Sequence, residues 1–244
     1  LSAEHFLSDG RPTGYGLGLR WDDIDGKRVI GHGGSHPGYK SYFLLDTIDK
    51  TGIVVVCNRE DADTHTIARD CMAALYGLSL PEKTSTIPDG LYVADTGPFW
   101  LEMRDGFANY LGAEDRLYDV GDGWTSSLSA SSPMKLRWDG DFLQGEIGHV
   151  RRKLRPVHPK PVAKEFDGRW NAPIYGASIT VDNGHIIMGI GPTRQIMPLE
   201  DLGHGRALFA LQDGPWSKRI CMHLIGENRL ELVLNRSRVI EYQR

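Results

Sequence analysis

The sequence has few cysteines, no strong excess of charge of either sign and no long apolar run. Its three cysteines, Cys57, Cys71 and Cys221, form no Cys-x-x-Cys pair, so we expect no disulfide framework and a reducing compartment. A formal net charge of -4 gives no electrostatic reason to expect nucleic acid as a partner. Apolar stretches such as Ile53–Cys57 are far shorter than the roughly 18 residues of a membrane span. We therefore expect a cytoplasmic protein that binds neither nucleic acid nor membrane.

The start of the sequence lacks the usual features of an amino terminus. It has no initiator Met, no basic segment and no apolar signal-peptide core, and Leu1–Phe6 is typical of the middle of a protein. We therefore expect further residues upstream of Leu1. A signal peptide among them would place the protein in the periplasm instead.

The turn-forming and apolar residues divide the chain into three regions, of which the first is residues 1–80. It contains strand patterns that end near residues 33, 45 and 57, and Ile53–Val56 is predicted to be buried on both faces. A helix follows, with Asp61 or Asp63 as its amino-terminal cap and Gly77 at its end. Its apolar residues at helical spacing, which we expect to face the sheet, are Ile67, Ala68, Cys71, Ala74, Leu75 and Leu78.

Residues 88–160 and 165–244 are each predicted to form a small antiparallel β-barrel. Both consist of short alternating segments, and pairs such as Asp105-Gly106 and Asn183-Gly184 supply the positive backbone angles of tight hairpins. Their similar openings suggest a duplicated unit. The predicted fold class is therefore mainly β, with the strands and helix of a partial α/β domain followed by two small lipocalin-like barrels.

The most distinctive local feature is the run Gly31-His32-Gly33-Gly34-Ser35. Glycine permits the close approach of a ligand to a strand. A histidine there can donate hydrogen bonds or move a proton near neutral pH. The alternative interpretation is a tight turn with a solvated histidine.

In its context this run resembles the β-lactamase-like, penicillin-recognising serine hydrolases. The context is Tyr15–Trp21 before it and Leu44–Asp46 and Val54–Arg59 after it. In that superfamily the Lys-Thr-Gly element on the edge of the catalytic sheet is often replaced by His-x-Gly, which matches His32-Gly33-Gly34. The two trailing barrels favour the D-aminopeptidase type. The resemblance implies release of N-terminal D-amino acids from short peptides or amides through an acyl-enzyme.

The resemblance also implies roles for individual residues. His32 would orient or polarise the substrate, and the backbone N–H of Ser35 would join the oxyanion hole, where such a donor stabilises the developing charge. Gly33 and Gly34 would let the substrate lie against the strand.

A hairpin near the end of the chain carries two more candidate substrate-binding residues. Asp213 and Gly214 occupy the place of a loop that, in the D-aminopeptidase type, restricts the active site to short substrates with a free amino end. Asp213 would pair with the substrate ammonium. The alternative is an ordinary turn aspartate.

The family's nucleophile should lie on a helix in a Ser-x-x-Lys motif, upstream of the His-x-Gly strand. The segment Ser132-Pro133-Met134-Lys135 matches as text only, because it contains Pro133 and precedes a predicted strand. We therefore expect the catalytic Ser and Lys on an N-terminal half outside this sequence, either joined to it or associated as a separate fragment.

Other interpretations of the sequence remain open. An esterase or a D-amino-acid amidase would use the same scaffold, and a complete chain without a nucleophile would be a non-catalytic β-barrel binding module. We expect no cofactor and no metal, because His32, His36 and His65 form no zinc motif. The expected partners are a small peptide or amide substrate, the N-terminal catalytic half and a second copy of the chain in a dimer.

Overall fold

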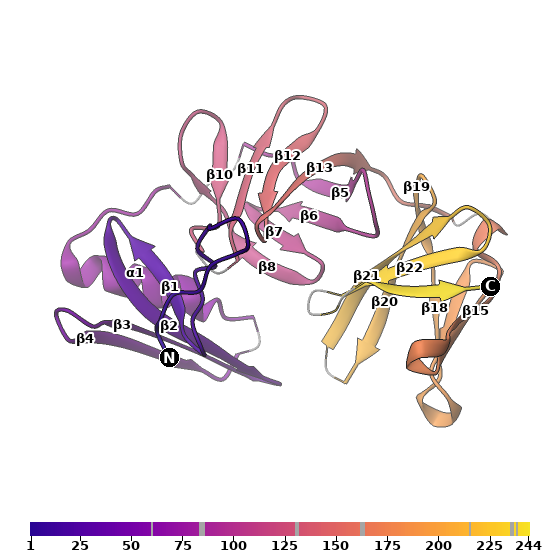
Figure 1. The fold of residues 1–244 in the computed structure, drawn as a ribbon, viewed down its shortest axis with the longest axis horizontal. Helices are drawn as coiled ribbons and strands as arrows, with labels where there is room; N and C mark the ends of the chain where they lie inside the picture. Colours follow the sequence, from indigo (N-terminus) through magenta and orange to yellow (C-terminus); the bar gives the residue numbers. More distant parts are fainter. Residues whose placement is uncertain are drawn as a thin grey trace. The chain divides into compact units, whose positions relative to one another are not determined.

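The computed structural model describes residues 1–59, 61–82, 86–129, 132–161, 164–214, 216–234, 237 and 239–244. Strands dominate it (Figure 1), which confirms the mainly-β prediction. The chain splits into two compact units. The first comprises Leu1–Thr86, Arg116–Arg137 and Gly145–Arg151, and the second comprises Ile87–Asp115, Trp138–Gln144 and Arg152–Arg244. No helix among the described residues is long and apolar enough to cross a bilayer.

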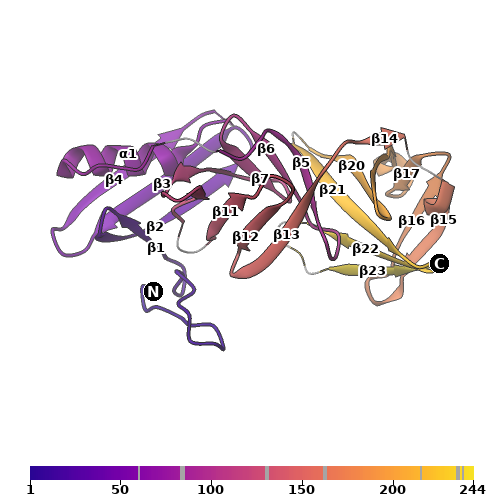
Figure 2. The same ribbon diagram turned by 90° about the horizontal axis from the view of Figure 1, so that it is seen from above.

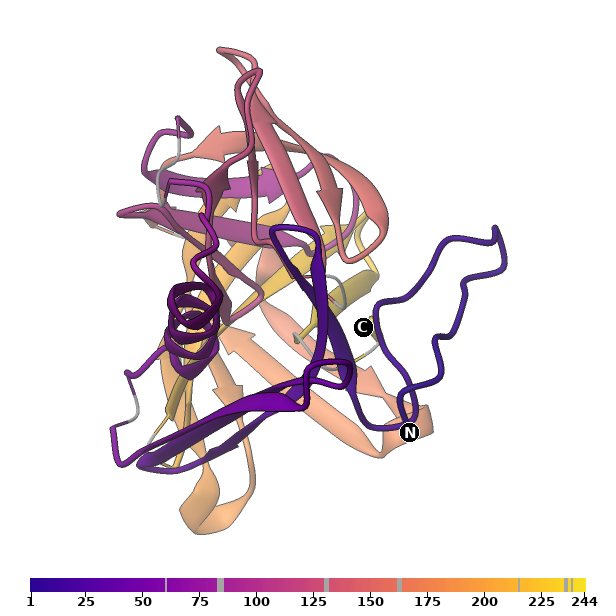
Figure 3. The ribbon, with the colours of Figure 1, turned by 90° about the vertical axis from the view of Figure 1, so that its left-hand side faces the viewer.

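The first unit begins with an extended segment and a four-stranded antiparallel sheet. Residues 1–19 form the segment, which leaves the sheet as a loop (Figures 2 and 3). The strands are β1 (Arg20–Ile24), β2 (Lys27–His36), β3 (Tyr39–Asp46) and β4 (Thr51–Cys57), in the order β1-β2-β3-β4. The Asp25-Gly26 turn between β1 and β2 has positive φ at both residues, as a tight hairpin of this twist requires.

Helix α1 (Thr64–Tyr76) follows β4 and packs on β3 and β4. Of the two predicted caps, Asp63 is the one used: its carboxylate accepts a hydrogen bond from the backbone N–H of Thr66 at 3.0 Å. Gly77 ends the helix in the left-handed conformation, as predicted.

The predicted buried stripe of α1 is wrong in part. Ala68 is buried as expected, but Ile67 and Leu75 are 43% and 57% exposed, and Cys71 is exposed as well. Met72 and the charged Arg69 are buried instead. Apolar residues occur on two sides of this helix. The side that carries Arg69 faces the sheet, because the Arg69 guanidinium pairs there with the buried carboxylate of Asp22, 3.6 Å away.

The burial predicted for both faces of β4 is also wrong. Its residues alternate: Ile53 and Val55 pack against the core beneath α1, whereas Val54 and Val56 are 74% and 75% exposed. Strand β4 ends the sheet, and α1 covers one face of it. The four apolar residues in a row therefore contribute to two different surfaces.

A nine-stranded antiparallel sheet follows in the order β8-β7-β6-β5-β13-β12-β11-β10-β9. Its strands are β5 (Gly90–Ala94), β6 (Trp100–Arg104), β7 (Phe107–Tyr110), β8 (Ala113–Arg116), β9 (Tyr118–Asp119), β10 (Trp124–Ser126), β11 (Met134–Trp138), β12 (Leu143–Ile147) and β13 (Val150–Val157). The Asp105-Gly106 turn joins β6 to β7 with φ values of 50° and 75°, so this predicted hairpin is confirmed.

A ten-stranded sheet occupies the rest of the second unit, in the order β14-β19-β20-β21-β22-β23-β15-β16-β17-β18. Its strands are β14 (Lys160–Pro161), β15 (Gly168–Ala172), β16 (Ala177–Asp182), β17 (His185–Met188), β18 (Gln195–Pro198), β19 (Glu200–Gly203), β20 (Arg206–Asp213), β21 (Trp216–Ile225), β22 (Arg229–Val233) and β23 (Ile240–Gln243). Short 3-10 helices lie at Lys164–Phe166, Pro173–Tyr175 and Gly191–Thr193.

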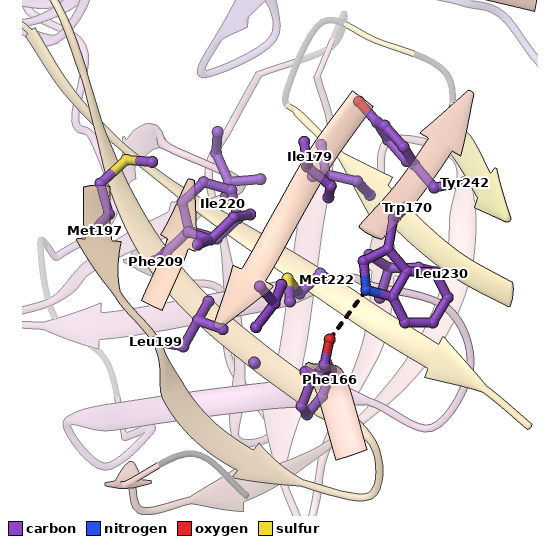
Figure 4. Packing of buried hydrophobic residues seen from close by; sticks show 14 of the residues in the cluster. Phe166, Trp170, Ile179, Met197, Leu199, Phe209, Ile220, Met222, Leu230 and Tyr242 are labelled. Atoms are coloured by element: carbon purple, nitrogen blue, oxygen red, sulfur yellow. Dashed lines mark hydrogen bonds between the residues drawn. The ribbon is translucent and has the colours of Figure 1, made fainter. Parts of the chain in front are cut away.

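This sheet curls around its own apolar side chains. Figure 4 shows Trp170, Phe209 and Met222 inside it, and Trp170 is fully buried. The indole N–H of Trp170 donates to the carbonyl of Phe166 at 3.0 Å, so its polar atom is satisfied. The side-chain amide of Gln195 in β18 donates to the backbone carbonyl of Gln212 in β20 at 2.7 Å and accepts from the backbone N–H of Gln212 at 3.0 Å.

Candidate active site

Strand β2 continues beyond its neighbour on one side. It pairs with β1 only as far as Gly31, whereas its pairing with β3 runs to His36, opposite Tyr39. The stretch from His32 to His36 therefore has β3 beside it but, in the described register, no residue of β1. A strand with an unpaired side of this kind can accept an extended ligand through main-chain hydrogen bonds.

His32 lies where this unpaired stretch begins, and both of its ring nitrogens have partners. Its Nε2 lies 2.7 Å from the hydroxyl of Tyr15, and its Nδ1 lies 2.6 Å from the carbonyl oxygen of Gly33. The Tyr15 and His32 rings meet edge to face, with centroids 6.0 Å apart. Sequence reasoning gave Tyr15 no role, because nothing in the sequence itself links it to a histidine 17 positions later.

The two glycines that follow His32 face different neighbours. A Cβ on Gly33 would lie 3.0 Å from the ring of Tyr42, which belongs to the core beneath α1. A Cβ on Gly34 would lie 2.6 Å from the hydroxyl of Ser41. Gly33 therefore leaves room for a core tyrosine, and Gly34 leaves room for a serine hydroxyl. Their proposed contact with a substrate stays a prediction.

Ser35 is exposed near the end of β2, opposite Lys40 of β3. Its position two residues beyond Gly33 on the stretch without β1 is compatible with a backbone donor to a ligand. The predicted role of its N–H in an oxyanion hole stays a prediction.

A buried ionic cluster lies in the same sheet. Asp22 of β1 is 1% exposed, and its Oδ2 is 3.2 Å from His65 Nε2 and 3.1 Å from the Tyr42 hydroxyl, which donates to it. The guanidinium of Arg69 lies 3.6 Å from Oδ1 of Asp22. The cluster thus links β1, β3 and α1 through one carboxylate.

The charges of this cluster set its protonation. Burial alone would raise the pKa of Asp22, but the hydrogen bond from His65 and the charges of His65, Arg69 and Arg20 more than offset it and lower that pKa. Burial and the charge of Asp22 raise the pKa of the Tyr42 phenol. Tyr42 therefore stays protonated and donates to Asp22, so we assign this cluster a structural role.

Two arginines of this cluster region also hold a neighbouring segment of the same unit. Arg69 donates to the carbonyl oxygens of Leu128 at 2.8 Å and Asp23 at 2.9 Å. Arg20 donates to the hydroxyl of Ser129 at 2.7 Å. Because these donors are charged, the bonds are among the stronger ones in the unit.

The second pair of predicted substrate-binding residues lies in the other compact unit. Asp213 ends β20 in an exposed hairpin, where its carboxylate forms an ion pair with Lys218. Gly214 has φ of +59°, the left-handed conformation that suits a turn glycine. The carboxylate already has a cation in this hairpin, and its predicted pairing with a substrate ammonium stays a prediction.

The text match Ser132-Pro133-Met134-Lys135 is not helical. Ser132 lies in a bend, and Met134 and Lys135 begin β11, as the sequence predicted. The Lys135 ammonium lies 5.5 Å from the ring centroid of Trp124. This segment does not have the helical geometry on which a Ser-x-x-Lys nucleophile depends.

Two of the three histidines considered as metal ligands have other partners in the described structure. His65 contacts Asp22, and His32 contacts Tyr15 and Gly33. Within the described ranges, no group of three or more His, Cys, Asp or Glu residues is arranged to hold a metal ion.

Comparisons with known proteins match the first part of the chain to one family model and most of the chain to curated relatives. A family model described as Beta-lactamase matches residues 1–75, which include β2 and α1 up to Leu75. A D-aminopeptidase of Cereibacter sphaeroides is 24% identical over 239 residues, covering 86% of this chain and 44% of the relative. A D-aminopeptidase of Brucella ovis is 25% identical over 166 residues, covering 65% of this chain and 30% of the relative.

Among solved structures, an octameric penicillin-binding protein homologue from Pyrococcus abyssi matches with a TM-score of 0.27 and 13% identity, over 94% of this chain and 36% of that chain. The chain spans 44% of the length of the Cereibacter relative. The family match and the D-aminopeptidase matches confirm the resemblance to β-lactamase-like proteins of the D-aminopeptidase type.

Proposed function

We propose that this chain, which resembles β-lactamase-like proteins of the D-aminopeptidase type, forms one wall of the active site of a serine hydrolase. The reaction is the release of N-terminal D-amino acids from short peptides or amides. The observation that carries the proposal is His32, held by Tyr15 at the point where β2 extends past β1. The similarity to D-aminopeptidases along most of the chain supports the substrate class.

In this proposal the substrate lies along β2 from His32 to Ser35. A serine hydroxyl attacks the substrate carbonyl and gives its proton to a lysine on the same polypeptide, and the Ser35 N–H donates to the resulting oxyanion. Collapse expels the leaving amine with that proton, and water then hydrolyses the acyl-enzyme. Loss of one oxyanion donor typically costs about 2.7–4 kcal/mol in such reactions.

The serine and lysine are proposed to come from a polypeptide N-terminal to Leu1, either joined to this chain or associated with it. Two apolar surfaces of the first unit support this. Val54 and Val56 are 74% and 75% exposed on the sheet, and Ile67 and Leu75 are exposed on α1. Exposed apolar groups of this kind mark surfaces that another layer covers. The length of the relatives leaves room for such a layer.

An esterase or a D-amino-acid amidase would use the same attack and the same strand. The difference lies in the leaving group and in the recognition of a free amino end. We favour the aminopeptidase because the D-aminopeptidase matches extend into the second unit. The relative rates on matched anilide, amide and ester substrates decide between the three.

The ten-stranded sheet does not favour a binding module for an apolar ligand. Its interior is occupied by aromatic and aliphatic side chains, including Trp170 and Phe166, which are both fully buried. A ligand would have to displace them, at the cost of a well-packed core.

The test is expression of the gene product with its upstream coding region, followed by assays of D-alanine and L-alanine p-nitroanilides. We expect turnover of the D-form only. Equal turnover of both forms, or of simple esters alone, would remove the substrate claim. An upstream region without a Ser-x-x-Lys segment would remove the hydrolase. Light scattering on the same sample tests the expected dimer.

His32→Gln is the first variant to measure in that assay. Removal of the imidazole, which in this proposal orients the substrate on β2, should lower kcat/KM about 100-fold, the order of loss that a misplaced substrate produces. His36→Gln is the matched control, because His36 lies on the same strand and is exposed. Equal losses in both variants would show that the effect comes from the strand and not from the His32 ring.

A further inference from the structure

Tyr15 and His32 form a defined pair whose protons can be assigned from chemistry alone. The carbonyl oxygen of Gly33 only accepts hydrogen bonds, so the Nδ1 atom of His32, 2.6 Å away, must carry a hydrogen. In a neutral imidazole the other nitrogen is then an acceptor. The Tyr15 hydroxyl, 2.7 Å from Nε2, therefore donates to it. The His32 ring is thus held by an acceptor at Nδ1 and by a donor at Nε2.

We propose that Tyr15 is a positioning residue that orients the His32 ring and so holds Nδ1 against the Gly33 carbonyl, the acceptor that selects the Nδ1–H tautomer. The role in the reaction rests on the proposed function. The tautomer itself does not, because it follows from two hydrogen bonds within the first unit. Which nitrogen of a histidine carries the proton is set by the bond that the other nitrogen makes.

The segment around Tyr15 is built to hold this side chain in place. The backbone N–H of Tyr15 donates to the hydroxyl of Thr13 at 3.2 Å, and that hydroxyl lies 3.0 Å from the carbonyl oxygens of both Tyr15 and His5, which share its one hydrogen. The backbone N–H of Trp21 donates to the carbonyl of Gly14 at 2.8 Å. The hydroxyl of Thr13 thus ties both ends of the tyrosine backbone.

The residue after Tyr15 adds a steric constraint. A Cβ on Gly16 would overlap the carbonyl oxygen of Leu1 and lie 2.8 Å from that of Ala3. Only glycine fits there without a shift of backbone. The backbone N–H of Gly16 also donates to the carbonyl of Leu19 at 2.7 Å. Tyr15 is therefore presented to His32 from a segment packed on both sides.

In the proposed site, each nitrogen of the His32 ring therefore has one hydrogen-bonding role. With Nδ1–H committed to Gly33, neutral His32 presents a lone pair at Nε2 and no donor. A substrate group that displaces the Tyr15 hydroxyl must therefore be a donor, as the ammonium of a free amino end is. Without Tyr15 the ring is free to turn away from the Gly33 carbonyl, which releases Nδ1 and makes the other tautomer, with its N–H at Nε2, accessible.

The test is nitrogen NMR of the complete gene product, labelled with 15N-histidine. His32→Gln identifies the His32 signals by their loss. In the wild type we expect the Nδ1–H tautomer to dominate. In Tyr15→Phe the ratio of Nδ1–H to Nε2–H should fall about fivefold, which corresponds to ~1 kcal/mol for the lost hydrogen bond. Tyr39→Phe, an exposed hydroxyl deletion in β3, should leave the ratio unchanged.

Two results would overturn the proposal. One is a wild-type His32 with its proton on Nε2, and the other is a Tyr15→Phe ratio equal to that of the wild type. Both readings are independent of turnover. An inactive protein with the expected tautomers would refute the proposed function and keep the pair, and an active protein with the wrong tautomer would do the reverse.

If both survive, Tyr15→Phe should lower kcat on the D-anilide about tenfold and leave the melting temperature close to that of the wild type. A structural effect alone would lower the melting temperature and leave the tautomer ratio as it is. Tyr15→Leu also removes the ring that meets His32 edge to face. Comparing it with Tyr15→Phe separates the effect of the hydroxyl from that of the ring.

Discussion

The four-stranded sheet and the ten-stranded sheet bury their apolar faces in different ways. The ten-stranded sheet curls around its own side chains, so that Trp170 and Phe166 are fully buried by strands of the same sheet. The four-stranded sheet is covered by α1 on one face, while Val54 and Val56 stand exposed on the other. The first arrangement is complete in itself, and the second has a surface suited to a further layer.

The two regions also differ in how they bury charge. In the first unit the Asp22 carboxylate lies near Arg69 and His65, so a buried cation has a buried anion beside it. In the second unit the Arg206 guanidinium, 4% exposed, donates to the carbonyl oxygens of Asp95, Gly97 and His204. We therefore expect the stability of the first unit to depend on protonation of the Asp22 carboxylate, and that of the second unit to depend on other titratable groups.

The largest expected effect is in the ten-stranded sheet. Trp170→Ala removes a fully buried indole and its hydrogen bond to Phe166, and should lower the free energy of unfolding by about 3–5 kcal/mol. Urea unfolding followed by hydrogen exchange of peptides from each unit measures it. Ile174→Ala, at a residue 92% exposed, should change stability by less than about 0.5 kcal/mol. A small loss at Trp170 would mean that this core is not the stabilising centre of the sheet.

A matched pair in β4 examines the other half of the comparison. Val55 packs beneath α1, so Val55→Ala should cost about 1–2 kcal/mol. Val54 is 74% exposed, and Val54→Ala should cost less than about 0.5 kcal/mol in this chain alone. In the gene product with its upstream region, Val54→Ala should become as costly as Val55→Ala. If Val54 stays neutral there, the exposed face of the sheet is not covered by that region.

The hairpins and strands were largely predictable because their signals are local. Asp105-Gly106 and Asn183-Gly184 both have positive φ at the two turn residues, as their chemistry requires. Burial on β4 and α1 was not predictable in the same way. An apolar run does not say which faces have a neighbour, and the inward turn of Arg69 depends on Asp22, 47 positions away in the sequence, a separation that no helical periodicity records.

The candidate site was predictable only as a motif. His32 and its glycines could be identified because glycine and histidine at the end of a strand are chemically distinctive. The pairing with Tyr15 could not, since it depends on the path of residues 14–19 in space. The need for a glycine at position 33 could not be predicted either, because it depends on the ring of Tyr42 on the neighbouring strand.

Acid should affect the two units in different pH ranges. Burial and the charges of Arg206 and Arg229 lower the pKa of His223 from 6.5 to about 4. Its contribution to stability is present above pH 6.5 and is lost as pH falls toward 4, because the unfolded chain binds the proton more readily. The loss in the second unit should be about 1 kcal/mol, discounted for solvent near the ring. Hydrogen exchange of the second unit across this range measures it.

The first unit should respond at lower pH. The pKa of Asp22 is held below its ordinary value of 3.8, so its contribution is present above that value and is lost as pH falls through the lower folded one. Asp46, whose pKa is lowered by Lys27, adds a loss of the same sign. The difference in pH-dependent stability between the wild type and Asp22→Asn isolates the contribution of Asp22. His223→Gln should flatten only the response of the second unit, and equal responses of both units would contradict the assignment.

Small effects on stability are also expected at the two glycines beside His32. Gly33→Ala must shift the buried Tyr42 ring, 3.0 Å from the new methyl, and should cost about 1 kcal/mol. Gly34→Ala meets only the Ser41 hydroxyl, which can rotate away, and should cost less than about 0.5 kcal/mol. If the substrate lies on this strand, the order reverses in kcat/KM, because the methyl at 34 stands on the face that carries His32. Equal kcat/KM in the two variants would place the substrate elsewhere.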